Sequence, residues 1–97
     1  MLLSPQQVKQ ALPELPGWQL VHDALERVVD CPTYPVALAL VQAIGIHAEA
    51  VNHHPDMMLH YKRLTIRYHT HTPSGITEKD FEGVQAVNQL LSALPGS

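Results

Sequence analysis

Apolar and polar positions alternate between helix-like and strand-like spacing along the chain. The sequence Ser4-Pro5-Gln6-Gln7 has the form of a helix cap, which predicts a short first helix ending near Pro13. The segments 18–21 and 25–29 are typical of two short strands, and the turn-forming residues 22–24 join them. The first third of the chain is therefore predicted to be a helix followed by a β-hairpin.

The middle of the chain repeats this order. A capping residue and an early proline within 33–35 predict a second helix over 35–52, the longest uninterrupted segment. Pro55 disfavours helical geometry at the residue before it, so the helix must end there. Apolar residues then alternate with polar ones over 64–68, the period of a half-buried strand, and 57–60 supplies its partner across a turn near 61–63.

The last segment of the sequence predicts a third helix and completes the fold. Thr77 and Asp80 have the spacing of a capping box, and the helix is expected to stop at Pro95-Gly96. Its apolar residues recur at intervals of three and four: Phe81, Val84, Val87, Leu91 and Leu94. The order α-β-β-α-β-β-α predicts one α+β domain over 1–97, a two-layer sandwich whose four-stranded antiparallel sheet carries three helices on one face.

Composition adds an expectation about assembly. A chain of 97 residues buries a modest core, and only 15% of its residues are charged against 45% hydrophobic. The segment 36–46 is apolar nearly all round, whereas a helix on one sheet needs a single apolar stripe. We therefore expect a homo-oligomer, a dimer or a tetramer, that associates through helix 35–52 and the sheet edges.

Net charge, the length of the apolar run and cysteine content limit the partners and the cellular compartment that we expect. The net charge of −3 gives no basic footprint, so direct binding of nucleic acid is not expected. The run 36–46 is shorter than the about 20 residues that a membrane span needs. A single cysteine, Cys31, and no secretory pattern at the amino terminus favour a cytoplasmic protein without a membrane anchor.

Histidines are the candidate chemical groups. Six of the seven lie within 47–71, and the imidazole pKa of about 6.5 suits proton transfer near neutrality. Glu49 precedes His53 by four residues, so on a continuing helix its carboxylate would orient that imidazole. If the second hairpin is centred near Lys62, His71 comes opposite His53, with His54 beside them.

Three imidazoles at one opening can supply an acid and a base to a small substrate, and no serine or cysteine is placed as a nucleophile. Addition or removal of water is the reaction class that needs only such transfers. Other readings remain open: His53-His54 is also a favourable helix end, and three histidines can bind catalytic zinc.

The spaced histidine pattern resembles the signature of the pterin-4a-carbinolamine dehydratases. The resemblance runs from the Pro16-Gly17-Trp18 turn to the last helix. It rests on seven residues at fixed intervals: Glu49, His53-His54-Pro55, Tyr61, His71 and Asp80. It implies removal of water from a 4a-hydroxytetrahydropterin to give the quinonoid dihydropterin, which recycles the tetrahydrobiopterin-type cofactor of aromatic amino acid hydroxylases. No metal and no organic cofactor are implied.

The resemblance also implies roles for individual residues. His53 and His71 would form the acid/base pair, and His54 would bind the substrate and polarise the surroundings of the hydroxylated carbon. Asp80 would support the site from the start of the last helix, and Trp18 would lie near the pterin pocket. Glu49 and Pro55 complete the expected set of supporting residues.

An alternative function belongs to a different class. Members of this family in animals also bind a transcription factor through a helical surface, so the resemblance equally admits a non-catalytic interaction or coactivator-type protein on the same scaffold. The apolar segment 36–46 would be its contact surface. The complete set of histidines favours the enzyme, because a pure scaffold has no need of them.

Overall fold

A computed structural model describes residues 2–94 of the chain. Helices and strands follow in the predicted order, with a short 3-10 helix after the first helix. The elements are α1 (Pro5–Ala11), η1 (Leu12–Glu14), β1 (Gln19–Val21), β2 (Ala24–Asp30), α2 (Tyr34–Val51), β3 (Asp56–His60), β4 (Arg63–Tyr68) and α3 (Glu78–Ser92). The predicted α+β fold is confirmed, while the expected helix stop at Pro95-Gly96 lies outside the described residues.

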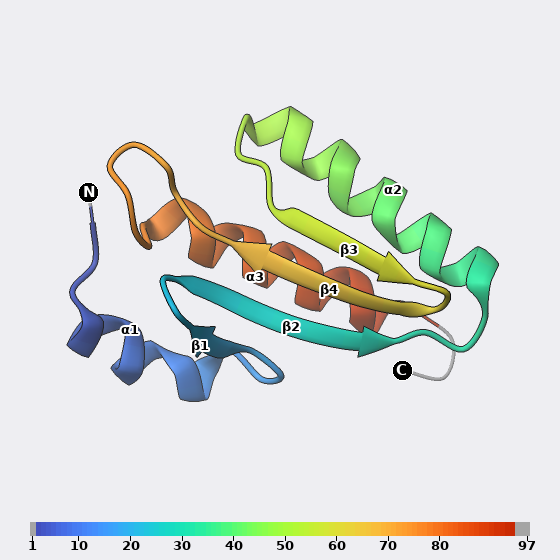
Figure 1. Ribbon diagram of the computed structural model, residues 1–97, viewed down its shortest axis with the longest axis horizontal. Coiled ribbons are helices and arrows are strands. Elements are labelled where there is room, and N and C mark those ends of the chain that lie inside the picture. Colours follow the sequence, from blue (N-terminus) through green and yellow to red (C-terminus); the bar gives the residue numbers. More distant parts are fainter. Residues whose placement is uncertain (1, 95–97) are drawn as a thin grey trace.

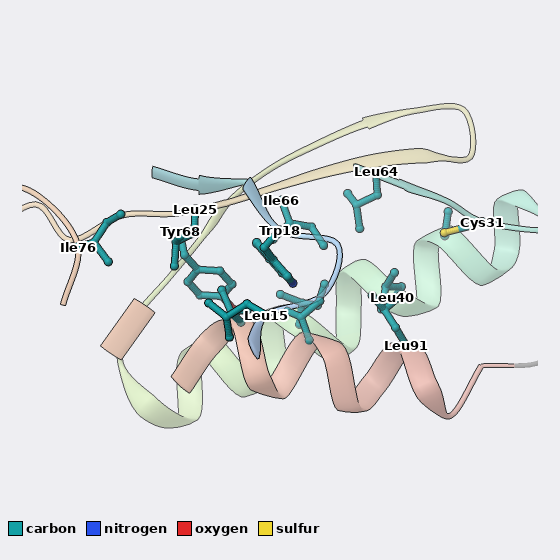
Figure 2. Packing of buried hydrophobic residues seen from close by; sticks show 14 of the residues in the cluster. Leu15, Trp18, Leu25, Cys31, Leu40, Leu64, Ile66, Tyr68, Ile76 and Leu91 are labelled. Carbon is teal, nitrogen blue, oxygen red and sulfur yellow. The ribbon is translucent and has the colours of Figure 1, made fainter. Parts of the chain in front are cut away.

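The four strands form one antiparallel sheet in the order β1-β2-β4-β3 (Figure 1). Alternation along β4 buries Leu64, Ile66 and Tyr68, each with no exposed surface, and leaves the residues between them partly exposed. The buried side chains fill the space between the sheet and the helices, as Figure 2 shows for Ile66, Tyr68 and Leu91. All three α-helices contribute to this core, so the opposite face of the sheet stays open.

Helix caps fix where the elements begin, as the sequence predicts. The Ser4 hydroxyl accepts a hydrogen bond from the Gln7 backbone N–H, and the Gln7 side chain accepts one from the Ser4 N–H. The Thr33 hydroxyl caps α2 by accepting from the Val36 N–H at 3.2 Å. Each bond satisfies a backbone donor that the first helical turn leaves free.

The turn of the second hairpin is one residue shorter than predicted. His60 pairs with Arg63, so the turn consists of Tyr61 and Lys62 alone, and Tyr61 adopts a φ of 54°. Continued beyond Asp56, this register puts Thr70, and not His71, opposite His53. The prediction failed because it assumed a turn centred on Lys62, and a shift of one residue exchanges the two faces of a strand.

Helix α2 covers the core with one stripe only. Ala37, Leu40, Ile44 and Ala48 are buried, while Ile46 on the outer side is 64% exposed. By length and composition the helix could cross a membrane, a test that core helices of soluble proteins also pass. Its buried stripe packs on the same core as the sheet.

Candidate active site

A cleft of about 440 Å³ opens where α2 ends, β3 begins and the chain leaves β4. It brings together His53, His54 and Pro55 from the first connection and His71 from the second. The three candidate histidines therefore border one opening, although the predicted register that led to this expectation was wrong. The other lining residues are Asn52, Asp56, His69, Thr70, Thr72 and Lys79.

His53 is held by Asp80 at the back of this cleft. Its Nε2 lies 2.6 Å from Asp80 Oδ1; the His53 side chain is 13% exposed and that of Asp80 is fully buried. An ionised carboxylate can only accept hydrogen bonds, so this pairing puts a proton on His53 Nε2. The second nitrogen, Nδ1, is then the one free to exchange protons.

The sequence fixes Asp80 through the cap of α3. Thr77 is the N-cap residue, and the Asp80 carboxylate reaches back to accept from the Thr77 N–H at 2.9 Å. A negative charge in the first helical turn is favoured by the exposed N–H groups and the helix dipole. The side chain that completes the capping box and the side chain that pairs with His53 thus belong to the same residue, Asp80.

Glu49 pairs with His54 and not with His53, which corrects the predicted partner. Glu49 Oε2 lies 2.8 Å from His54 Nε2, and both side chains are largely exposed. The helix ends at Val51, and Asn52 takes a left-handed conformation with φ 54°. His53 therefore leaves the helical path, and the four-residue spacing no longer puts it above Glu49.

His71 lies on the connection that follows β4, with His69 beside it. The two imidazole centroids are 5.2 Å apart with an edge-to-face angle of 72°. Backbone hydrogen bonds between Thr70 and Gly75, at 2.7 and 2.9 Å, close this loop. His69 and Thr70 were not among the predicted site residues; the spacing of His69 and His71 by two residues was the available signal for His69.

Trp18 does not line the cleft. It is 5% exposed, its indole N–H donates to Asn88 Oδ1 at 2.8 Å, and its ring packs on Tyr68 with centroids 6.0 Å apart. The Tyr68 ring in turn stacks on His53 at 6.2 Å and 20°. Trp18 therefore reaches His53 only through Tyr68.

Tyr68 carries a buried hydroxyl next to the site. Among residues 2–94, no hydrogen-bond partner is found for this oxygen. Burial, and then the nearby charge of Asp80, raise the pKa of Tyr68 to about 12. The hydroxyl therefore stays protonated, and the ring serves as a wall behind His53.

The described residues contain no group of three or more histidine, cysteine, aspartate or glutamate side chains placed to hold a metal ion. His53 and His54 instead turn to two different carboxylates, Asp80 and Glu49. The zinc reading of the three histidines gains no geometric support from residues 2–94.

Comparison with known proteins places the chain in a family. Residues 1–90 match the family model described as "Pterin 4 alpha carbinolamine dehydratase". Two relatives carry the name "Putative pterin-4-alpha-carbinolamine dehydratase". The one from Mycolicibacterium smegmatis is 40% identical over 91 residues, covering 94% of this chain and 97% of the relative. The one from Herpetosiphon aurantiacus is 36% identical over 92 residues, covering 95% and 96%.

A solved structure supports the same assignment. A Brucella melitensis protein described as a "transcriptional coactivator/pterin dehydratase" superposes with a TM-score of 0.89 at 27% identity, covering 93% of this chain and 98% of that one. The predicted resemblance is confirmed: this chain belongs to the pterin-4-alpha-carbinolamine dehydratase family and is an enzyme of the dehydratase class.

Proposed function

We propose that the chain converts 4a-hydroxytetrahydropterin into the quinonoid dihydropterin and water by histidine acid/base catalysis. The observation that carries the proposal is the convergence of His53, His54 and His71 on one cleft, in a chain of this family. Its volume of about 440 Å³ falls within the roughly 300–1,000 Å³ of small-molecule sites. A bicyclic pterin ring is of suitable size.

The reaction needs two proton transfers and no net change in protons. An acid protonates the departing 4a-hydroxyl as its C–O bond breaks, and a base removes a proton from the ring nitrogen. We assign these transfers to His53 and His71, which approach the cleft from separate connections. Each well-placed transfer contributes about 10²–10⁴ in rate.

The neighbouring residues assist this pair. Asp80 orients His53 through their 2.6 Å contact, and its negative charge stabilises the imidazolium whenever His53 is protonated. Glu49 holds His54, which we assign to binding the substrate and polarising the surroundings of the hydroxylated carbon. Pro55 shapes the cleft wall, and Trp18 backs His53 through Tyr68.

Substitution of the pair tests the proposal. His53→Ala and His71→Ala should each keep the fold, as judged by circular dichroism, and each should lose at least about 10²-fold in carbinolamine dehydration. His60→Ala is the matched control, because His60 lies exposed at the far end of β3 and should keep full activity. Unchanged turnover in both cleft variants would contradict the assignment.

We further propose that copies of the chain associate through the outer side of α2. Leu38 and Ile46 are 46% and 64% exposed there, beside a groove of about 330 Å³ between α2 and α3. In this groove His47 Nδ1 is buried, without a partner among the described residues. Exposed apolar side chains beside an apolar groove suit contact with a second protein surface.

This surface is also the basis of the second candidate function. The Brucella neighbour's description combines coactivator with dehydratase, so a protein partner could occupy the same side of α2. We favour a second copy as the occupant and the enzyme as the function. As a dehydratase, the protein would act in the cytoplasm and return the pterin cofactor of aromatic amino acid hydroxylases to use.

A further inference from the structure

We propose that Thr70 is a positioning residue for the dehydration reaction, acting through Asp80 on His53. Its hydroxyl orients the Asp80 carboxylate, and this carboxylate sets which nitrogen of His53 carries the proton. The inference rests on the proposed function for its catalytic consequence. Its structural part concerns the tautomer of the His53 ring, which can be measured without an activity assay.

The hydrogen bonds around Thr70 have only one consistent direction. Thr70 Oγ1 lies 2.7 Å from Asp80 Oδ2 and 2.9 Å from Thr77 Oγ1. Because the carboxylate can only accept, Thr70 donates to Asp80, and Thr77 must donate to Thr70. Thr77 Oγ1 in turn accepts from the Lys79 N–H at 3.3 Å.

Every donor in this series of hydrogen bonds therefore points toward the Asp80 carboxylate. The series runs from the first turn of α3 through two hydroxyls to Asp80, and His53 Nε2–H closes it from the other side. Hydrogen bonds aligned in this way strengthen one another in a low-dielectric interior. The free His53 nitrogen is then held as Nδ1, the atom available for proton exchange.

Burial makes the Thr70 hydroxyl hard to replace. Asp80 has no exposed surface, so water cannot easily take over a lost hydrogen bond to Oδ2. Without the Thr70 donor, the Thr77 N–H would be the donor left for that oxygen within residues 2–94. The carboxylate could then rotate, and His53 could adopt the tautomer with its proton on Nδ1.

The backbone of Thr70 makes a second, separate contribution. Its N–H donates to the Gly75 carbonyl at 2.7 Å, and its carbonyl accepts from the Gly75 N–H at 2.9 Å. These bonds close the loop that carries His71. One residue thus connects both members of the proposed acid/base pair. A side-chain substitution leaves these backbone bonds in place and removes the contacts of the hydroxyl to Asp80 and Thr77.

The experiment compares Thr70→Val, which deletes the hydroxyl at nearly constant shape, with Thr70→Ser, which keeps it. Thr70→Val should lower kcat by roughly ten- to a hundredfold, the range found for outer partners of ligating histidines, with KM little changed. Thr70→Ser should restore most of the loss. Thr65→Val, on the open face of the preceding strand β4, should match the wild type.

Nitrogen-15 NMR of the imidazole rings gives a readout that does not require activity. The wild-type His53 spectrum should show the tautomer protonated on Nε2, and Thr70→Val should show a mixture. A wild-type His53 protonated on Nδ1 would overturn the proposal even if the valine variant failed to fold. An unchanged His53 spectrum and kcat in Thr70→Val would overturn it as well. If the wild type lacked dehydratase activity, the proposed function would fail while the NMR comparison still decided the role of Thr70.

Discussion

At the scale of single residues, the site depends on how the Tyr68 ring is accommodated. A Cβ atom at Gly83 would lie 2.3 Å from Tyr68 Cε1, so only glycine leaves room for the ring at this point of α3. The ring can then pack between Trp18 and His53. A residue of the last helix thereby helps to place the proposed catalytic histidine.

Replacing Tyr68 by phenylalanine tests whether this ring acts only by its shape. Tyr68→Phe removes a buried hydroxyl that has no partner among the described residues, so at neutral pH the free energy of unfolding should rise by about 1 kcal/mol. The stacking on His53 remains, so dehydratase activity should be kept. Chemical denaturation and the carbinolamine assay measure the two quantities.

The stability of Tyr68→Phe should also depend on pH differently from that of the wild type. The pKa of Tyr68 is about 12 in the folded protein and about 10 in an unfolded chain, so between these values the folded state binds more protons. Stability from this group is full below about pH 10 and is lost as pH rises toward 12. Tyr68→Phe lacks this loss, so its stability advantage should widen across that interval; a constant difference would contradict a buried, protonated tyrosine.

Candidate site residues that occur at a characteristic spacing could be predicted from the sequence. His53, His54 and His71 were found in this way, and they share the cleft. The capping spacing predicted Asp80 as a helix cap, and the family resemblance implied its supporting role; in the structure it caps α3 and contacts His53. Thr70 escaped prediction because a threonine after a strand has no distinctive pattern; its role depends on a side-chain contact made across ten residues.

At the scale of elements, caps and alternation predicted every α-helix and strand, but neither the 3-10 helix η1 nor the details at the ends of the elements. Two predictions were wrong: the register of the second hairpin and the pairing of Glu49 with His53. Both errors arose where a residue other than glycine adopts a positive φ. Tyr61 shortened the hairpin turn and shifted the register, and Asn52 ended α2 and moved His53 away from Glu49. Such conformations are uncommon for these side chains, so the local sequence gives little warning of them.

The outer side of α2 leads to a prediction about self-association. A charge at Ile46, in Ile46→Glu, would have to be buried in a contact between copies, so the variant should sediment near the monomer mass of 10.8 kDa. The wild type should sediment at a multiple of that mass. Analytical ultracentrifugation measures both.

Val28→Glu is the matched control for this experiment. Val28 is 51% exposed on the open face of the sheet, so a charge there should leave the mass of the oligomer unchanged. A wild type that is monomeric at micromolar concentration would contradict self-association and leave the α2 surface to a different protein partner.

At the scale of the whole molecule, the two-layer arrangement explains why the site lies where it does. The carboxyl end of α2, the start of β3, the loop after β4 and the first turn of α3 meet at one end of the sandwich (Figure 1). Each supplies something different: imidazoles come from the connections, and the carboxylate comes from the helix cap. The fold class was predictable from element order, but this meeting depends on tertiary packing.

The most direct test of the central claim is where a pterin binds. A 7,8-dihydropterin lacks the 4a-hydroxyl and cannot be dehydrated, so it can be titrated into the protein while the imidazole resonances are followed by NMR. We predict that His53, His54 and His71 shift together with one dissociation constant, while His22 and His60, which lie outside the cleft, stay unchanged. Saturable shifts at His22 without shifts at the cleft histidines, or no shifts at all, would contradict the account.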